Sequence, residues 1–145
     1  MPDLSLATFT LNGRMSRRQF LRRWLHISYL MGAIIVAGVF LIIQGIPFAG
    51  YGAAGLIGLL ILANYAIVVR RFHDRNMSGW WLVILLGIGI AGSFLQAYER
   101  SYPVAAGIGS LALLAINLWL LIELFFRQGT AGQNRFGEDP SAAQA

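Results

Sequence analysis

Four long apolar blocks, separated by short polar segments, dominate the 145-residue sequence. A helix rises about 1.5 Å per residue, so about 20 apolar residues cross the roughly 30 Å hydrocarbon core of a bilayer. Each block is long enough to cross alone or with some tilt. The expected spans are residues 24–43, 51–69, 80–97 and 104–126. The sequence therefore predicts an all-α polytopic membrane protein with four transmembrane helices.

Composition excludes an ordinary soluble domain, because 57% of the residues are apolar and only 12% are charged. A soluble protein averages about half apolar and about a quarter charged residues. The length is that of one domain. We therefore expect residues 1–140 to form one small four-helix bundle in the bilayer, followed by a disordered tail at residues 141–145.

Arginine is unevenly distributed between the two sides that four crossings define. All eleven basic residues are arginines, and ten of them lie before the first span, between the second and third, or after the fourth. Only Arg100 lies in a connection on the other side. The positive-inside rule therefore predicts that both termini are cytoplasmic.

The net charge of +5 suits anionic lipid headgroups or phosphates as partners. Nucleic acid is disfavoured, because the arginines are divided among short segments and form no continuous basic face. The chain has no cysteine, which excludes disulfides and thiolate chemistry. Its two histidines, His26 and His73, lack a metal-binding spacing, so we expect neither a metal site nor a cofactor.

The segment before the first span carries a helix start. Ser16 and Gln19 stand at capping-box spacing, which predicts that a helix begins there. Arg14, Arg18 and Arg22 then recur every fourth residue and predict a basic stripe on that helix. A lipid phosphate beside this stripe would also meet the free N–H groups of the first helical turn. The alternative is that these arginines serve only to set the topology.

Two further features of this segment bear on its place in the membrane. Phe20 and Trp24 are expected on a flank that faces lipid. The run from Ser16 through Arg17 to Leu21 is close to a twin-arginine export signal. Three more spans follow it, however, which favours the basic flank of a membrane anchor.

The connection between the second and third spans is dense in polar residue types. Asp74 can accept hydrogen bonds from an arginine or orient the imidazole of His73. As chemistry, His73 and Asp74 could form a general base and its orienting group. We favour a structural role, in which Asp74 neutralises an arginine and His73 is an interfacial side chain. Asn76 or Ser78 is expected to cap the third helix.

The segment after the fourth span contains glycines suited to tight turns and a proline. We expect it to fold as a turn that packs back on the other two polar segments. The residues expected to bind an anion or a partner are Arg14, Arg17, Arg18, Arg70, Arg71, His73, Asp74, Arg75, Asn134, Arg135 and Asp139. Those expected to be structural are Ser16, Ser78, Gly79, Trp80, Trp81, Glu123 and Arg127.

Four polar residues lie at or near membrane depth, namely Asn64, Gln96, Asn117 and Glu123. Such groups either bind neighbouring helices together or line a transport pathway, and the sequence leaves both open. Glu123 is the costliest to bury. Arg127 follows it by four residues, which predicts an ion pair on one helix face.

Three motifs occur in order along the chain. They are Gly13-Arg14-x-Ser16-Arg17-x-x-Phe20, then Arg70-Arg71-x-His73-Asp74-x-x-x-Ser78-Gly79-Trp80-Trp81, and finally Asn134-Arg135-Phe136-Gly137-x-Asp139-Pro140. Together they resemble the domain of unknown function 805 family of small bacterial membrane proteins, from about residue 9 to 140. The sequence departs from that family's usual pattern at Gln19, Leu21 and Phe72. The resemblance implies a multi-pass protein of the bacterial inner membrane, with four helices, cytoplasmic signature residues and no established activity.

Three functions fit these observations. The first is a non-enzymatic module whose arginine-rich polar face binds anionic lipid headgroups or a partner protein. The second is a small transporter or channel that must oligomerise, because four short helices leave little room for a pathway in one copy. The third is a lipid- or phosphate-modifying enzyme that uses His73 and Asp74. We favour the first.

Overall fold

The computed structural model describes residues 9–97 and 101–140, and the side chains of all of these except residues 95–97. Three helices are long and apolar enough to cross a membrane, and α3 is a shorter apolar helix. The all-helical prediction with four apolar helices is confirmed. The predicted disordered tail at residues 141–145 lies outside the described residues. In chain order the elements are α1 (Arg17–Ile43), α2 (Ala49–Asp74), α3 (Trp80–Ala97), α4 (Pro103–Leu121) and the π-helix η2 (Ile122–Phe126).

Helix α1 begins where the capping box predicted. The Ser16 hydroxyl accepts a hydrogen bond from the backbone N–H of Gln19 (3.4 Å), and the Gln19 carbonyl oxygen accepts one from the backbone N–H of Ser16 (3.2 Å). Because Arg14 precedes this cap and is buried, it does not lie on α1. The predicted stripe of three arginines is therefore wrong, and only Arg18 and Arg22 form it.

Helices α1 and α2 form a closely packed hairpin. Gly38 of α1 is buried, and a Cβ atom there would lie 2.9 Å from the Cβ of Ala53 on α2. Small residues at such positions let two helix backbones approach each other in a membrane. Between the helices, Gly45 adopts φ +85°, a conformation that residues with a side chain rarely adopt. These two glycines allow the close contact and the tight turn of the hairpin.

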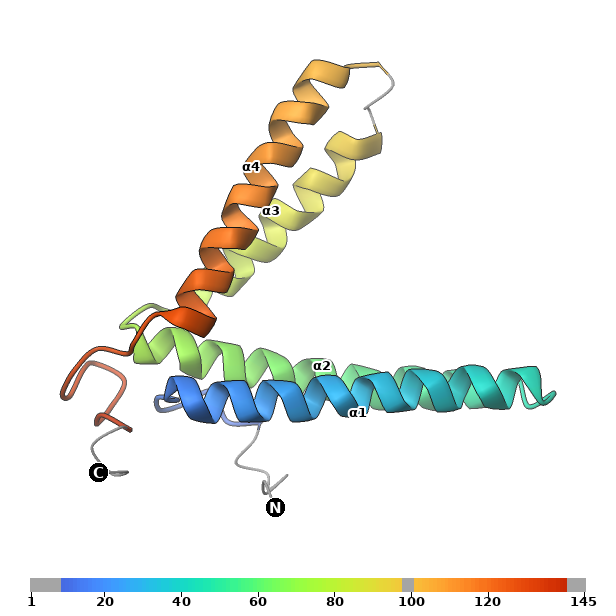
Figure 1. Ribbon diagram of the computed structural model, residues 1–145, viewed down its shortest axis with the longest axis horizontal. Coiled ribbons are helices and arrows are strands. Elements are labelled where there is room, and N and C mark those ends of the chain that lie inside the picture. The colour runs from blue at the N-terminus through green and yellow to red at the C-terminus, as the bar shows by residue number, and fades with distance from the viewer. Residues whose placement is uncertain (1–8, 98–100, 141–145) are drawn as a thin grey trace.

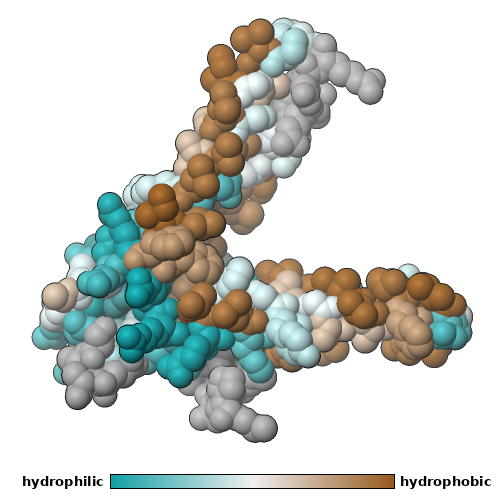
Figure 2. All heavy atoms as spheres, in the orientation of Figure 1, coloured by the Kyte–Doolittle hydropathy of each residue, from teal (hydrophilic) through white to brown (hydrophobic). Residues whose placement is uncertain are grey.

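The chain forms two hairpins that diverge from a common base, α1 with α2 and α3 with α4 (Figure 1). The element of the second hairpin that packs against both α1 and α2 is η2. Apolar residues run along both arms, and hydrophilic residues gather at the base (Figure 2). The expected single bundle is therefore not formed. Hydrocarbon solvates apolar side chains as well as another helix does, so no hydrophobic force closes the hairpins on each other.

The main apolar core lies where α1, α2 and η2 meet. Phe20 is fully buried there, and its ring packs edge-on against Phe125 with centroids 5.2 Å apart. Its predicted place on a lipid-facing flank is therefore wrong. Trp24 contacts Phe125 in the same way, at 5.0 Å, and is partly buried. The buried members of this core are Met15, Phe20, Ile27, Ala63, Ile67, Phe72 and Leu124.

This packing predicts a large difference between two neighbouring residues of α1. Phe20→Ala should lower the free energy of unfolding by about 3–5 kcal/mol, because it leaves a cavity at the base of the hairpins. Leu21→Ala should have a much smaller effect, since the Leu21 side chain is 41% exposed. Denaturant unfolding in detergent, followed by circular dichroism, measures both. Equal midpoints for the two variants would contradict the burial of Phe20.

Candidate functional site

The three polar segments predicted from the sequence meet at the base of the hairpins, which Figure 2 shows as a hydrophilic region. We call residues 12–23, 70–79 and 127–140 the polar layer. The end of α2 is its scaffold. The last carbonyl groups of a helix have no partner within the helix, so other groups must supply hydrogen bonds.

The segment after η2 supplies these hydrogen bonds to α2. The carbonyl oxygen of His73 accepts one from the side-chain amide of Asn134 (3.0 Å). The carbonyl oxygen of Asp74 accepts two from Thr130, from its backbone N–H (2.8 Å) and its hydroxyl (3.1 Å). The expectation that the last segment packs back on the α2–α3 connection thus agrees with the structure.

A buried ion network centres on Asp74. Its Oδ1 atom accepts a hydrogen bond from Nε of Arg14 (3.1 Å) and lies 3.0 Å from Nη2 of the same guanidinium. Its Oδ2 atom accepts one from Nη1 of Arg71 (2.5 Å). The three side chains are between 0 and 3% exposed. One carboxylate is therefore shared by two buried cations.

The remaining donors of these two arginines bind backbone carbonyl oxygens. A guanidinium has five N–H donors, more than one carboxylate can satisfy. The partial negative charges of the carbonyl groups also offset the excess positive charge. The acceptors are the oxygens of Thr130 (2.5 Å), Gly132 (2.5 Å) and Gly137 (3.3 Å) for Arg14, and those of Leu124 (2.9 Å) and Arg127 for Arg71.

Gly129 stands where no side chain fits. A Cβ atom at this position would collide with the carboxylate of Asp74. The chain therefore passes directly over the ion network on its way from η2 to Thr130. A glycine is required there because of this close approach and not because of an unusual φ.

A second ion network centres on Glu123 in the π-helix. Its Oε2 atom lies 3.3 Å from Nη1 of Arg127, so the predicted ion pair is confirmed. Its Oε1 atom accepts a shorter hydrogen bond, 2.7 Å, from Nε of Arg75. Arg75 also donates to the carbonyl oxygen of Gln128. These contacts tie η2 to the α2–α3 connection.

The hydrogen bonds of the described residues do not pair His73 with Asp74. The His73 ring stacks on Phe136, with centroids 3.9 Å apart and planes within 4°. Its Nδ1 atom lies 3.2 Å from the carbonyl oxygen of Gly13. Both carboxylate oxygens of Asp74 are held by arginines. The structure thus uses His73 to join the three polar segments.

Arg135 contacts both the α2–α3 connection and its own segment, and Asp139 contacts its own segment. The guanidinium of Arg135 donates to the carbonyl oxygen of Asn76 (2.9 Å) and lies over the Phe136 ring, 4.6 Å from its centroid. The Asp139 carboxylate accepts a hydrogen bond from the backbone N–H of Gly132 (3.2 Å). These contacts fold the segment into a turn above α2.

Ser78 caps the start of α3, as one of the two predicted capping residues. The Ser78 hydroxyl accepts a hydrogen bond from the backbone N–H of Trp80 (3.4 Å). A Cβ atom on Gly79 would lie 2.9 Å from a methyl carbon of Val69, so a glycine allows α3 to leave close to α2. The indole rings of Trp80 and Trp81 are exposed, as suits side chains at a membrane–water boundary.

Helix α1 presents exposed arginines at the edge of the polar layer. Arg17, Arg18 and Arg22 are exposed, and Arg17 donates to the carbonyl oxygen of Phe126 (3.2 Å). Arg23 is partly buried, and its Nη1 atom has no hydrogen-bond partner within the described residues. The guanidinium of Arg70 lies close enough for its charge to repel that of Arg23. This edge of the layer is strongly positive.

The polar residues at membrane depth do not share one environment. The Asn64 side-chain oxygen is buried and has no hydrogen-bond partner among the described residues. Asn117 is exposed and donates to the carbonyl oxygen of Leu113 in its own helix (2.8 Å). The side chain of Gln96 lies outside the described ones. A packing role and a pathway role for these three residues both stay predictions.

The network at Asp74 predicts a large effect of a small change. Asp74→Asn keeps the side-chain size but leaves the charges of Arg14 and Arg71 buried without a counter-ion, which should cost about 3–5 kcal/mol. Glu138→Gln removes the same charge from an exposed position and should cost little. Denaturant midpoints in detergent measure both variants. A wild-type midpoint for Asp74→Asn would mean that Asp74 does not balance these arginines.

Three proteins of Escherichia coli (strain K12) are similar to this chain over most of its length. It is 29% identical to "Uncharacterized protein YiiR" over 138 residues, which cover 90% of this chain and 86% of that protein. It is 28% identical to "Inner membrane protein YhaH" over 134 residues, covering 88% and 84%. For "Inner membrane protein YhaI" the identity is 27% over 132 residues, covering 89% and 84%.

No solved structure matches this chain significantly. One family model does, from residue 8 to residue 138, and its description is "Protein of unknown function (DUF805)". This match includes all four helices and nearly all of the polar layer. The chain therefore belongs to the DUF805 family of proteins of unknown function.

Proposed function

We propose that this protein is a non-enzymatic inner-membrane module whose polar layer binds anionic phospholipid headgroups through the arginines of α1. The membrane-length helices and the relatives named inner membrane proteins support the location. The observation that carries the proposal is the excess of arginine that remains after the buried acids Asp74 and Glu123 are neutralised.

Two buried acids engage four of the arginines. Asp74 pairs with Arg14 and Arg71, and Glu123 pairs with Arg75 and the exposed Arg127. Within the described residues, neither Arg18 nor Arg22 forms an ion pair, and both side chains are exposed. They lie just before the apolar stretch of α1, where we expect the lipid headgroups. Each arginine near an anionic membrane surface contributes about 1 kcal/mol to binding.

The start of α1 also lacks a negative charge of its own. Its first turn contains Arg17 and Arg18 and no acidic residue. Two cations there oppose the positive end of the helix dipole, and an anion would relieve that repulsion. A phosphate group would supply that negative charge.

The orientation of the layer follows from the positive-inside rule and has its own test. Phe48, between α1 and α2, and Gln133, in the last segment, are both exposed. The chain has no cysteine, so Phe48→Cys and Gln133→Cys each carry one thiol. An impermeant maleimide should label only Phe48→Cys in intact cells and both variants after permeabilisation. Labelling of Gln133→Cys in intact cells would place the polar layer outside.

Lipid binding is tested by neutralising the two exposed arginines. In native mass spectrometry from detergent with equal phosphatidylglycerol and phosphatidylcholine, Arg18→Gln/Arg22→Gln should retain less phosphatidylglycerol. The loss of about 2 kcal/mol corresponds to a roughly 30-fold weaker affinity. The charge-conserving Arg18→Lys/Arg22→Lys variant should keep most of the binding, and Arg100→Gln should keep all of it. Unchanged phosphatidylglycerol retention in the glutamine variant would refute the proposal.

A further inference from the structure

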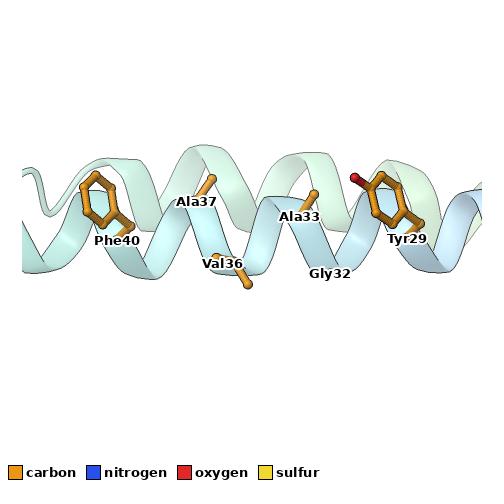
Figure 3. Close-up of a pocket in the computed structure, with 6 residues that line it drawn as sticks. All are labelled: Tyr29, Gly32, Ala33, Val36, Ala37 and Phe40. Atoms are coloured by element: carbon orange, nitrogen blue, oxygen red, sulfur yellow. The ribbon is translucent and has the colours of Figure 1, made fainter.

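An apolar groove runs along the exposed face of α1. Its volume is about 620 Å³, and its lining is Tyr29, Gly32, Ala33, Val36, Ala37 and Phe40. Figure 3 shows the two aromatic rings at the ends of this row, with small side chains and the bare backbone of Gly32 between them. A Cβ atom on Gly32 would meet nothing within 4 Å. The groove is therefore open to whatever surrounds α1.

The groove continues the face of α1 that carries the two unpaired arginines. An α-helix turns once in 3.6 residues, so positions separated by 4, 7, 11 or 18 residues share a face. Tyr29 follows Arg22 by 7 residues, Ala33 by 11 and Phe40 by 18, while Arg18 precedes Arg22 by 4. One face of the helix thus presents a cationic pair and then an apolar groove.

We infer that this face of α1 binds a single anionic phospholipid, with its phosphate at Arg18 and Arg22 and one acyl chain in the groove. The inference rests on the proposed function and assigns it one defined site. A phospholipid has the same order of groups, an anion followed by a saturated or monounsaturated chain. The small residues between the rings of Tyr29 and Phe40 leave room for that chain.

The lengths agree with one leaflet of a bilayer. Half of the hydrocarbon core is about 15 Å deep, which equals about ten residues of helix. A chain that enters the hydrocarbon near His26 therefore passes Tyr29 and ends near Val36. The phosphate then lies about one helical turn before His26 in the sequence, beside Arg22.

A second copy of this chain fits the same face less well. Copies in one membrane share an orientation, so contact through the groove would align α1 with α1 in parallel. Arg18 and Arg22 would then meet the same two arginines of the other copy, and like charges at short range repel. An anionic lipid turns that repulsion into attraction. The charge of this face therefore favours a lipid over a self-contact.

The experiment fills the groove without changing any charge. Gly32→Leu/Ala33→Leu adds side chains where the lipid chain would lie, and leucine is a good helix former, so α1 should persist. The matched control is Gly107→Leu/Ala105→Leu on α4, where both positions are exposed and Gly107 has open space around it. Native mass spectrometry counts the phosphatidylglycerol molecules that survive increasing collisional activation.

Wild type and the control should retain one phosphatidylglycerol molecule under conditions that remove all others. The groove variant should lose this molecule, so that the fraction of protein that retains it is at least tenfold lower. If the groove variant keeps this lipid while Arg18→Gln/Arg22→Gln loses it, the groove inference fails and the proposed function stands. If both variants keep it, both fail. A dimer that the groove variant converts to monomers would also overturn the inference, since a second copy would then occupy this face.

Discussion

The carboxylate of Asp74 is the constraint on which the polar layer depends, because two buried guanidinium groups share it. An uncompensated buried charge costs several kcal/mol, so neither Arg14 nor Arg71 could remain inside without this partner. Their other donors bind carbonyl groups of the chain after η2. If the segment after η2 detached, these donors would lose their acceptors and Asp74 would be exposed to solvent. The network and the last segment must therefore form together, as one cooperative unit.

The same network determines which charges face outward. Asp74 holds Arg14 and Arg71 inside, Glu123 pairs with Arg75 and the exposed Arg127, and Arg18 and Arg22 remain exposed on α1. Arginine thus has two roles in one small protein: inside, it satisfies carbonyl oxygens and carboxylates, and outside, it is available to an anion. This division makes Arg18 and Arg22 better probes of binding than Arg71, whose neutralisation would disturb the network itself.

The apolar helices were predictable because a helix needs a minimum number of apolar residues to cross a bilayer, and this number can be counted in the sequence. The capping box and the Glu123–Arg127 pair were predictable because both are local. The contact between Arg75 and Glu123 could not be predicted, because 48 residues separate them. The sequence also does not distinguish an arginine that sets the topology from one that binds an acid. Phe20 was misplaced for a related reason: its apolar character suits lipid and core equally. The packing of η2 on α1 and α2 was not predictable either, because it depends on tertiary contacts that no periodicity encodes.

The position of Arg17 joins the two parts of the molecule. Its guanidinium donates to the carbonyl oxygen of Phe126, the last residue of η2, while Arg18 beside it points into the exposed basic face. Since η2 is the element of the second hairpin that packs on both α1 and α2, this bond lies at the junction of the hairpins. A headgroup held at Arg18 therefore sits one residue from a contact between them. The surface that we propose binds lipid thus lies next to, and does not include, the contact between Arg17 and Phe126 at the junction of the hairpins.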